Sequence, residues 1–191
     1  LPNLTIMQPR DNAMLARMLV AALARDGPVV IRYPRDPGPD AEPSAAPAPL
    51  EHGRAEVLRG PGRPRAAVWI WTLGDMLPLA EAITGALAGT PLEPGIVDPR
   101  FIKPLDAVLL REQAPGTRLF VTLENGTVAG GFGSALQETL AAAGFAVPVL
   151  TLGWPDEVVG QGTTASLRTR YGLTAEAITA RIRQACPAGP S

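Results

Sequence analysis

A stretch rich in proline and alanine, residues 36–54, divides this sequence and limits what each side of it can form. Its sequence, DPGPDAEPSAAPAPLEHGR, offers almost no side chain for a buried core. Such a composition favours an extended linker between folded parts. We therefore expect a short folded part in residues 1–35 and a larger domain in residues 55–187, followed by a frayed tail in residues 188–191.

The first part has the pattern of a strand, a helix and a second strand. Residues 4–7 form a short apolar run, residues 11–26 repeat apolar side chains at helical spacing, and residues 29–31 are β-branched. Asp11 or Asn12 is suited to cap the helix at its start. A crossover of this kind joins parallel strands. Because two strands and one helix cannot bury a core alone, we expect this unit to be the end of a larger domain.

The larger part alternates between strands and helices. Strands are predicted at residues 55–58, 67–73, 96–97, 119–123 and 147–152, the first of them at a sheet edge. Helices are predicted at residues 76–88, from Pro104 to residue 109 or 110, from the glycines at 130–133 to residue 143, and at residues 174–185. This alternation predicts an α/β fold of three layers, in which a mostly parallel sheet carries helices on both faces.

The composition excludes several classes of protein. The net charge of −1, from 17 basic and 18 acidic residues, indicates no nucleic-acid partner and no membrane surface. No apolar run approaches the roughly 20 residues that span a bilayer, and no signal peptide opens the chain. Because Cys186 is the single cysteine, a disulfide within the chain is impossible, and we expect a cytoplasmic protein. The chain does not begin with Met, so we expect a piece of a longer protein.

Two arginines follow the second predicted strand and form the first candidate site. Arg32 and Arg35 stand at the carboxyl end of the strand at residues 29–31. Ligands bind at that edge of open α/β sheets. Two guanidinium groups there are suited to hold a phosphate through paired, charge-assisted hydrogen bonds. The alternative is a solvated strand end with ordinary surface arginines, and the spacing alone leaves both interpretations open.

Two further polar segments lie between a predicted strand and a predicted helix. The run Gly130-Gly131-Phe132-Gly133-Ser134 is superficially similar to a phosphate-binding loop, but no lysine follows it and its spacing departs from GxGxxG. We favour a helix start that packs tightly on the sheet, which glycine permits. Glu124 and Asn125 follow the strand at residues 119–123. An acid at the end of a strand is suited either to a functional role or to capping the loop, and we favour the cap.

The chain shows no self-sufficient catalytic set. The single histidine, His52, lies in the linker and is interpreted as solvated, and one histidine with one cysteine cannot form a metal cluster of the usual spacing. Ser134 stands in GFGSA rather than in the GxSxG of a nucleophile elbow. We therefore predict no catalytic residue and no metal ligand within this chain.

Five segments, in the same order along the chain, resemble the C-terminal region of 1-deoxy-D-xylulose-5-phosphate synthases, a family of transketolase-like enzymes. The resemblance covers nearly all of the chain outside the linker. The motif VAGGFGSA is more similar to the sequence of these synthases than to that of the β subunit of 2-oxo-acid dehydrogenases. The segments are LPNLTIMQPRD from Leu1, GPVVIRYPR from Gly27, PRFIKPLD from Pro99, LENGTVAGGFGSA from Leu123 and LGWPDEVVGQG from Leu152.

The resemblance implies an architecture and a reaction. Residues 1–35 would be the last β-α-β unit of a pyrimidine-binding domain, and residues 55–187 a complete transketolase C-terminal-like domain. Members of the family use thiamine diphosphate with Mg²⁺ to condense pyruvate with glyceraldehyde 3-phosphate, releasing carbon dioxide for isoprenoid precursor synthesis. The cofactor and catalytic residues of the family would lie before Leu1, so this part alone is expected to be inactive and to bind no cofactor.

The resemblance also assigns site residues. The second arginine of the family motif RYPRG contacts the phosphate of the acceptor substrate and matches Arg35, while Arg32 matches the first. The C-terminal domain is further expected to contribute to a homodimer interface. Two alternatives stay open: a non-catalytic assembly or binding module, and the C-terminal part of a 2-oxo-acid dehydrogenase β subunit.

Overall fold

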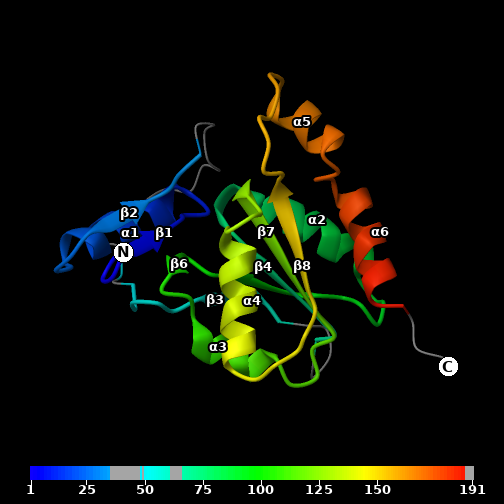
Figure 1. Ribbon diagram of the computed structural model, residues 1–191, viewed down its shortest axis with the longest axis horizontal. Coiled ribbons are helices and arrows are strands. Elements are labelled where there is room, and N and C mark those ends of the chain that lie inside the picture. Colours follow the sequence, from blue (N-terminus) through cyan, green and yellow to red (C-terminus); the bar gives the residue numbers. More distant parts are fainter. Residues whose placement is uncertain (35–47, 49, 61–65, 188–191) are drawn as a thin grey trace.

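The computed structural model describes residues 1–34, 48, 50–60 and 66–187 (Figure 1). Arg35, most of the predicted linker and the tail lie outside these residues. The described residues form two sheets, one of three strands in the order β2-β1-β6 and one of five strands in the order β3-β5-β4-β7-β8. Figure 1 shows the N-terminal unit, in blue, beside the larger sheet, with α5 and α6 on the other side of that sheet.

The smaller sheet contains the predicted strand-helix-strand unit. Its elements are β1 (Thr5–Met7), α1 (Asn12–Leu23) and β2 (Val29–Ile31), and the two strands are parallel as expected. The side chain of Asp11 caps α1 by accepting a hydrogen bond from the Met14 backbone N–H at 2.6 Å. In this unit, Leu23 of α1 is 89% exposed and Val30 of β2 is 42% exposed.

The third strand of this sheet comes from the distant part of the chain and was not predicted. Strand β6 (Phe101–Lys103) runs antiparallel to β1. Phe101 packs with Met7, Met14 and Met18 in a small core of its own. The prolines at 99 and 104 leave a strand of only three residues, which is too short to give a periodic signal in the sequence. The division of the chain at residues 36–54 stays a prediction.

The larger sheet confirms the mostly parallel α/β architecture. Its strands β5, β4, β7 and β8 pair in parallel, and β3 pairs antiparallel with β5 at one edge. The edge position of the first strand was predicted. The bounds of the strands are β3 (Glu56–Arg59), β4 (Val68–Thr72), β5 (Gly95–Asp98), β7 (Leu119–Thr127) and β8 (Val149–Trp154).

Helices cover both faces of the larger sheet. On one face, Val68 and Ile70 of β4 pack with α2 (Leu77–Leu87), which follows the 3₁₀ turn η1 (Gly74–Met76), and with α6 (Ala175–Ala185). On the other face, Trp69 and Trp71 pack with α3 (Ala107–Gln113) and α4 (Phe132–Ala142). Because successive side chains of a strand point to opposite faces, β4 contributes to both cores and the domain has three layers.

Two helices differ from the prediction. Helix α3 begins at Ala107 rather than at Pro104, because the Asp106 side chain accepts a hydrogen bond from the Leu109 N–H at 3.0 Å and so sets the cap three residues later than expected, and the helix continues to Gln113. Helix α5 (Thr164–Arg170) was not predicted. None of its residues is buried, so it has no apolar stripe for a sequence pattern to reveal.

Candidate functional site

Polar side chains gather where the parallel strands of the larger sheet end. Strands β4, β7 and β8 run in the same direction, so the residues that follow them share one edge of the sheet. The end of β2 reaches the same edge, through Arg32. We call this group the carboxyl-edge cluster; its members are Arg32, Asp75, Glu124, Asn125, Trp154 and Arg168.

Glu124 caps helix α4. Its side chain is 1% exposed, and its two carboxylate oxygens accept hydrogen bonds from the backbone N–H groups of Phe132 at 2.9 Å and Gly133 at 3.0 Å. Burial raises the pKa of Glu124, and the two N–H donors together with the nearby charge of Arg32 oppose that rise. Glu124 is thus a capping residue, as the sequence suggested, but it caps the start of helix α4 rather than the loop.

The glycines of the run 130–134 make room for this carboxylate. A Cβ on Gly131 would collide with the Glu124 carboxylate, and one on Gly133 would collide with the side chains of Thr122 and Thr151. The N-terminus of α4, which attracts anions, therefore already holds an anion of the protein itself. This arrangement supports the interpretation of a tightly packed helix start over that of a phosphate loop.

Asn125 joins two other elements through its side chain. Its Oδ1 accepts a hydrogen bond from Trp154 Nε1 at 2.7 Å, and its Nδ2 donates to Asp75 Oδ2 at 2.9 Å. The same oxygen of Asp75 accepts from Arg168 Nη2 at 3.0 Å. Burial raises the pKa of Asp75, and the charge of Arg168 opposes the rise. Asn125 is therefore fixed between β8 and the turn that follows β4.

Arg32 lies at this edge, as the sequence predicted for the end of β2. Its backbone N–H donates to the carbonyl of Met7 at 2.9 Å, which continues the β1–β2 pairing. Its guanidinium is exposed, and Nη2 donates to the backbone carbonyl of Asn125 at 3.3 Å. Arg35, the other candidate, lies outside the described residues, so its role stays a prediction.

A second polar group, missed in the sequence, ties the two sheets together. The carboxylate of Asp98, at the end of β5, is fully buried and lies 2.7 Å from Arg10 Nη1, which also contacts Glu56 at 2.7 Å. The other Asp98 oxygen accepts a hydrogen bond from the Arg100 N–H at 2.9 Å. Burial raises the pKa of Asp98, while Arg10 opposes the rise. In the sequence, the only sign of this group was an acidic residue, Asp98, at the end of an apolar strand.

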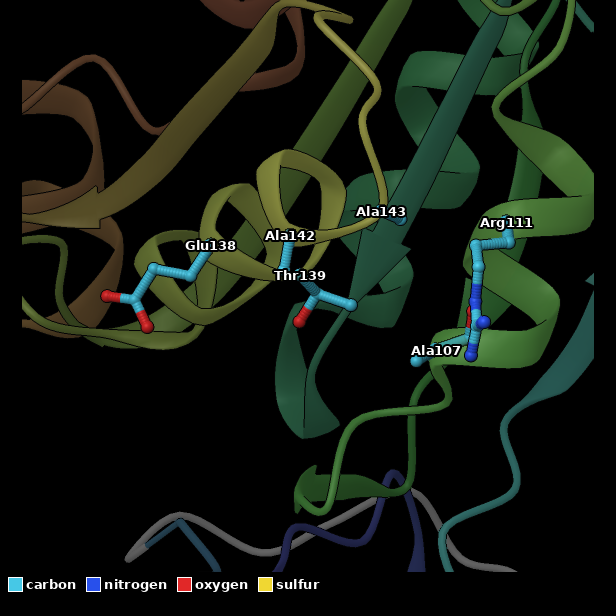
Figure 2. Close-up of a pocket in the computed structure, with 6 residues that line it drawn as sticks. All are labelled: Ala107, Arg111, Glu138, Thr139, Ala142 and Ala143. Carbon is cyan, nitrogen blue, oxygen red and sulfur yellow. The ribbon is translucent and has the colours of Figure 1, made fainter.

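Two cavities lie away from the carboxyl-edge cluster. One, of about 410 Å³, lies between α3 and the last turns of α4, and is lined by Ala107, Arg111, Glu138, Thr139, Ala142 and Ala143 (Figure 2). Because α4 begins at the carboxyl edge, its last turns lie toward the opposite edge of the sheet. The other, of about 250 Å³, lies beside α1 and includes the exposed His52, whose ring contacts Phe101 edge-on. Neither cavity brings the predicted site residues together.

The described residues offer no metal site and no membrane span. Among residues 1–34, 48, 50–60 and 66–187, no group of three or more His, Cys, Asp or Glu side chains is placed to hold a metal ion. In the same part of the chain, none of the helices has the length and apolar character needed to cross a bilayer.

The fold and the glycine-rich start of α4 place the chain in a known class. The family described as "Transketolase, C-terminal domain" matches residues 53–178, and the chain belongs to this family. Within it, the chain is similar to curated 1-deoxy-D-xylulose-5-phosphate synthases. It is 44% identical to that of Thioalkalivibrio sulfidiphilus over 95% of this chain and 27% of that protein, and 41% identical to that of Acidobacterium capsulatum over 93% and 28%.

These relatives are much longer than this chain, which spans 27–28% of their length and corresponds to their C-terminal part. The resemblance inferred from the five segments is thereby confirmed. Among solved structures, a chain described as "Split gene transketolase, inactive beta4 tetramer" is 33% identical with a TM-score of 0.84, covering 97% of this chain and 58% of that one. A transketolase variant from Pichia stipitis, 14% identical with a TM-score of 0.63, shares the fold.

Proposed function

We propose that this chain is the C-terminal portion of a thiamine-diphosphate-dependent transferase that condenses pyruvate with glyceraldehyde 3-phosphate and releases carbon dioxide. The observation that supports this most strongly is the identity of 41–44% with 1-deoxy-D-xylulose-5-phosphate synthases along 93–95% of the chain. The proposal extends to a cytoplasmic homodimer that takes part in isoprenoid precursor synthesis and binds neither nucleic acid nor membrane.

Within this function, the chain contributes contacts to the acceptor phosphate through Arg35 and Arg32. The position of Arg32 supports this, because its exposed guanidinium lies at the carboxyl edge where open α/β sheets bind ligands. A guanidinium matches a phosphate dianion in both charge and geometry. The larger domain also contributes to the dimer interface.

The cofactor belongs to the complete protein. When bound there with Mg²⁺, thiamine diphosphate would supply the stabilisation of a carbanion. The described residues of this chain do not fit that group: the N-terminus of α4 is filled by Glu124, and no cluster of metal-ligating side chains is present among them. We therefore derive no chemical step through the cofactor from this chain.

A second candidate function is a subunit that acts only with a separate chain. It is favoured by the similarity to a protein described as a split-gene transketolase, whose solved form is an inactive tetramer of one kind of subunit. The coding sequence before Leu1 separates the two candidates. A cofactor-binding region in the same reading frame supports the single-chain synthase, whereas a start codon close to Leu1 supports the subunit or a non-catalytic module.

The test of the proposed function uses the complete protein. Pyruvate and glyceraldehyde 3-phosphate are supplied together, and the release of carbon dioxide and the mass of the phosphorylated product are measured. Failure of the unmodified protein to form the condensation product would overturn the proposed function.

Arg35→Ala is expected to raise the KM for the phosphorylated acceptor much more than the KM for pyruvate, because only the acceptor carries the dianion. Steady-state kinetics with each substrate varied in turn measures this. Equal changes in both KM values would remove Arg35 from the phosphate site.

A further inference from the structure

The guanidinium of Arg32 lies against the main chain at the end of β7. Its Nη2 is 3.3 Å from the carbonyl oxygen of Asn125. The next residue, Gly126, has no side chain, and a Cβ at that position would lie 3.1 Å from the same nitrogen. A side chain at position 126 would therefore crowd the guanidinium, which would have to shift by a few tenths of an ångström.

The end of β7 is held rigidly where Arg32 meets it. The register between β7 and β8 shifts between Leu123 and Thr127, so this stretch departs from regular pairing. The Asn125 side chain fixes it again, through the hydrogen bonds to Trp154 and Asp75 at 2.7 and 2.9 Å. A carbonyl held in this way can orient a long side chain that would otherwise sample many rotamers.

The hydrogen-bond partner of Arg32 is a neutral carbonyl, so this contact does not neutralise the charge of the guanidinium. Among the described residues, no carboxylate lies within ion-pair distance of this guanidinium; the nearby Glu124 acts on it only through space. A carbonyl takes up one of the five N–H donors of an arginine and brings no formal negative charge of its own. This environment suits a cation that must attract an anionic ligand.

We propose that Asn125 and Gly126 are positioning residues that direct the guanidinium of Arg32 toward the phosphate of the acceptor substrate. The inference rests on the proposed function and deepens it, because it gives the C-terminal domain a part in acceptor recognition. Holding the guanidinium in place before the acceptor binds lowers the entropy that binding must remove. Neither residue touches substrate in this proposal; both act through Arg32.

The test is a double-mutant cycle in the complete protein. Arg32→Ala is expected to raise the acceptor KM about tenfold, the order expected for one hydrogen bond to a charged group, with the pyruvate KM unchanged. Gly126→Ala pushes the guanidinium aside and should raise the acceptor KM by roughly threefold without lowering kcat. In the Arg32→Ala background, Gly126→Ala should cause no further change, because residues that act as a unit are not additive.

Two further variants complete the design. Asn125→Ala should also raise the acceptor KM, as Gly126→Ala does. Because Asn125→Ala also removes the hydrogen bonds to Trp154 and Asp75, it affects folding as well. The inference is therefore tested mainly by Gly126→Ala. The matched control is Gly85→Ala, in the exposed part of α2, where a Cβ would meet no atom within 4 Å. It should leave both KM values unchanged.

The outcomes are distinct. Additive effects of Gly126→Ala and Arg32→Ala, or equal effects of Gly126→Ala on both KM values, would overturn the inference while the condensation reaction persists. If the unmodified protein fails to catalyse condensation, the binding of inorganic phosphate, followed by calorimetry, replaces the KM. The inference is supported if Arg32→Ala weakens phosphate binding, and if Gly126→Ala weakens it only when Arg32 is present. The inference would be overturned if neither variant changes the affinity for phosphate.

Discussion

The Glu124 carboxylate occupies the position at the start of α4 where a phosphate-binding helix would hold its ligand. Gly131 is the counterpart of this contact, since any Cβ there would collide with the carboxylate. The sequence displayed both residues, but their contact depends on the turn at residues 128–131 that brings the helix start back over the strand end. A sequence pattern does not encode that turn, so the two features were interpreted separately.

Glu124→Ala is expected to destabilise the protein by about 1–3 kcal/mol, because it leaves the two buried backbone N–H donors at the start of α4 without an acceptor. The cost depends on pH. The pKa of Glu124 in the folded protein is raised above the ordinary value of 4.5, so its favourable contribution is fully present below pH 4.5 and is lost as the pH rises through the raised pKa. The difference between the two proteins should therefore shrink as pH rises, which melting curves from pH 4 to pH 7 measure. A difference that grows with pH would contradict the assignment.

At the scale of the elements, the long periodic segments were predictable and the short ones were not. The helix α1 with its Asp11 cap, the buried strands β4 and β7 and the helix α6 follow from apolar periodicity and capping residues. Strand β6 and helix α5 were not predicted, because β6 has only three residues and α5 has no buried residue. For the site, the arginine at the end of β2 was foreseen, whereas the hydrogen bonds that Asn125 makes to Trp154 and Asp75 require the tertiary structure.

The ion pair between Arg10 and Asp98 connects the start of α1 with the end of β5 and so joins the two sheets. Asp98→Asn keeps the shape of the side chain but leaves Arg10 without its buried counter-charge. We expect a loss of about 3 kcal/mol in the free energy of unfolding, at the lower end for one partner of a buried pair, because Glu56 still contacts Arg10. Urea denaturation of the complete protein measures the loss.

The matched control for this experiment is Glu51→Gln. Glu51 pairs with Arg54 at 3.1 Å, and its side chain is 75% exposed. Removing that charge should cost less than about 1 kcal/mol, because exposed ion pairs contribute little. Similar losses in both variants would show that the Asp98 pair does not join the sheets in the way described.

At the scale of the whole molecule, the chain corresponds to a little more than a quarter of the synthases that it resembles. We expect the chain, expressed alone and shown by circular dichroism to be folded, to bind no thiamine diphosphate. The anion-attracting start of α4 is occupied by the protein's own carboxylate. Isothermal titration calorimetry with Mg²⁺ present tests this; affinity in the micromolar range would contradict the expectation.

The open side of the small sheet has a practical consequence for anyone who prepares this chain. Among the described residues, β2 pairs with β1 on one side only, and Leu23 of α1 and Val30 of β2 are exposed. Unpaired strand edges flanked by apolar side chains act as templates for other extended chains, including further copies of the same protein. The outer edge of β2 is therefore one place at which copies of the isolated chain are expected to associate during purification.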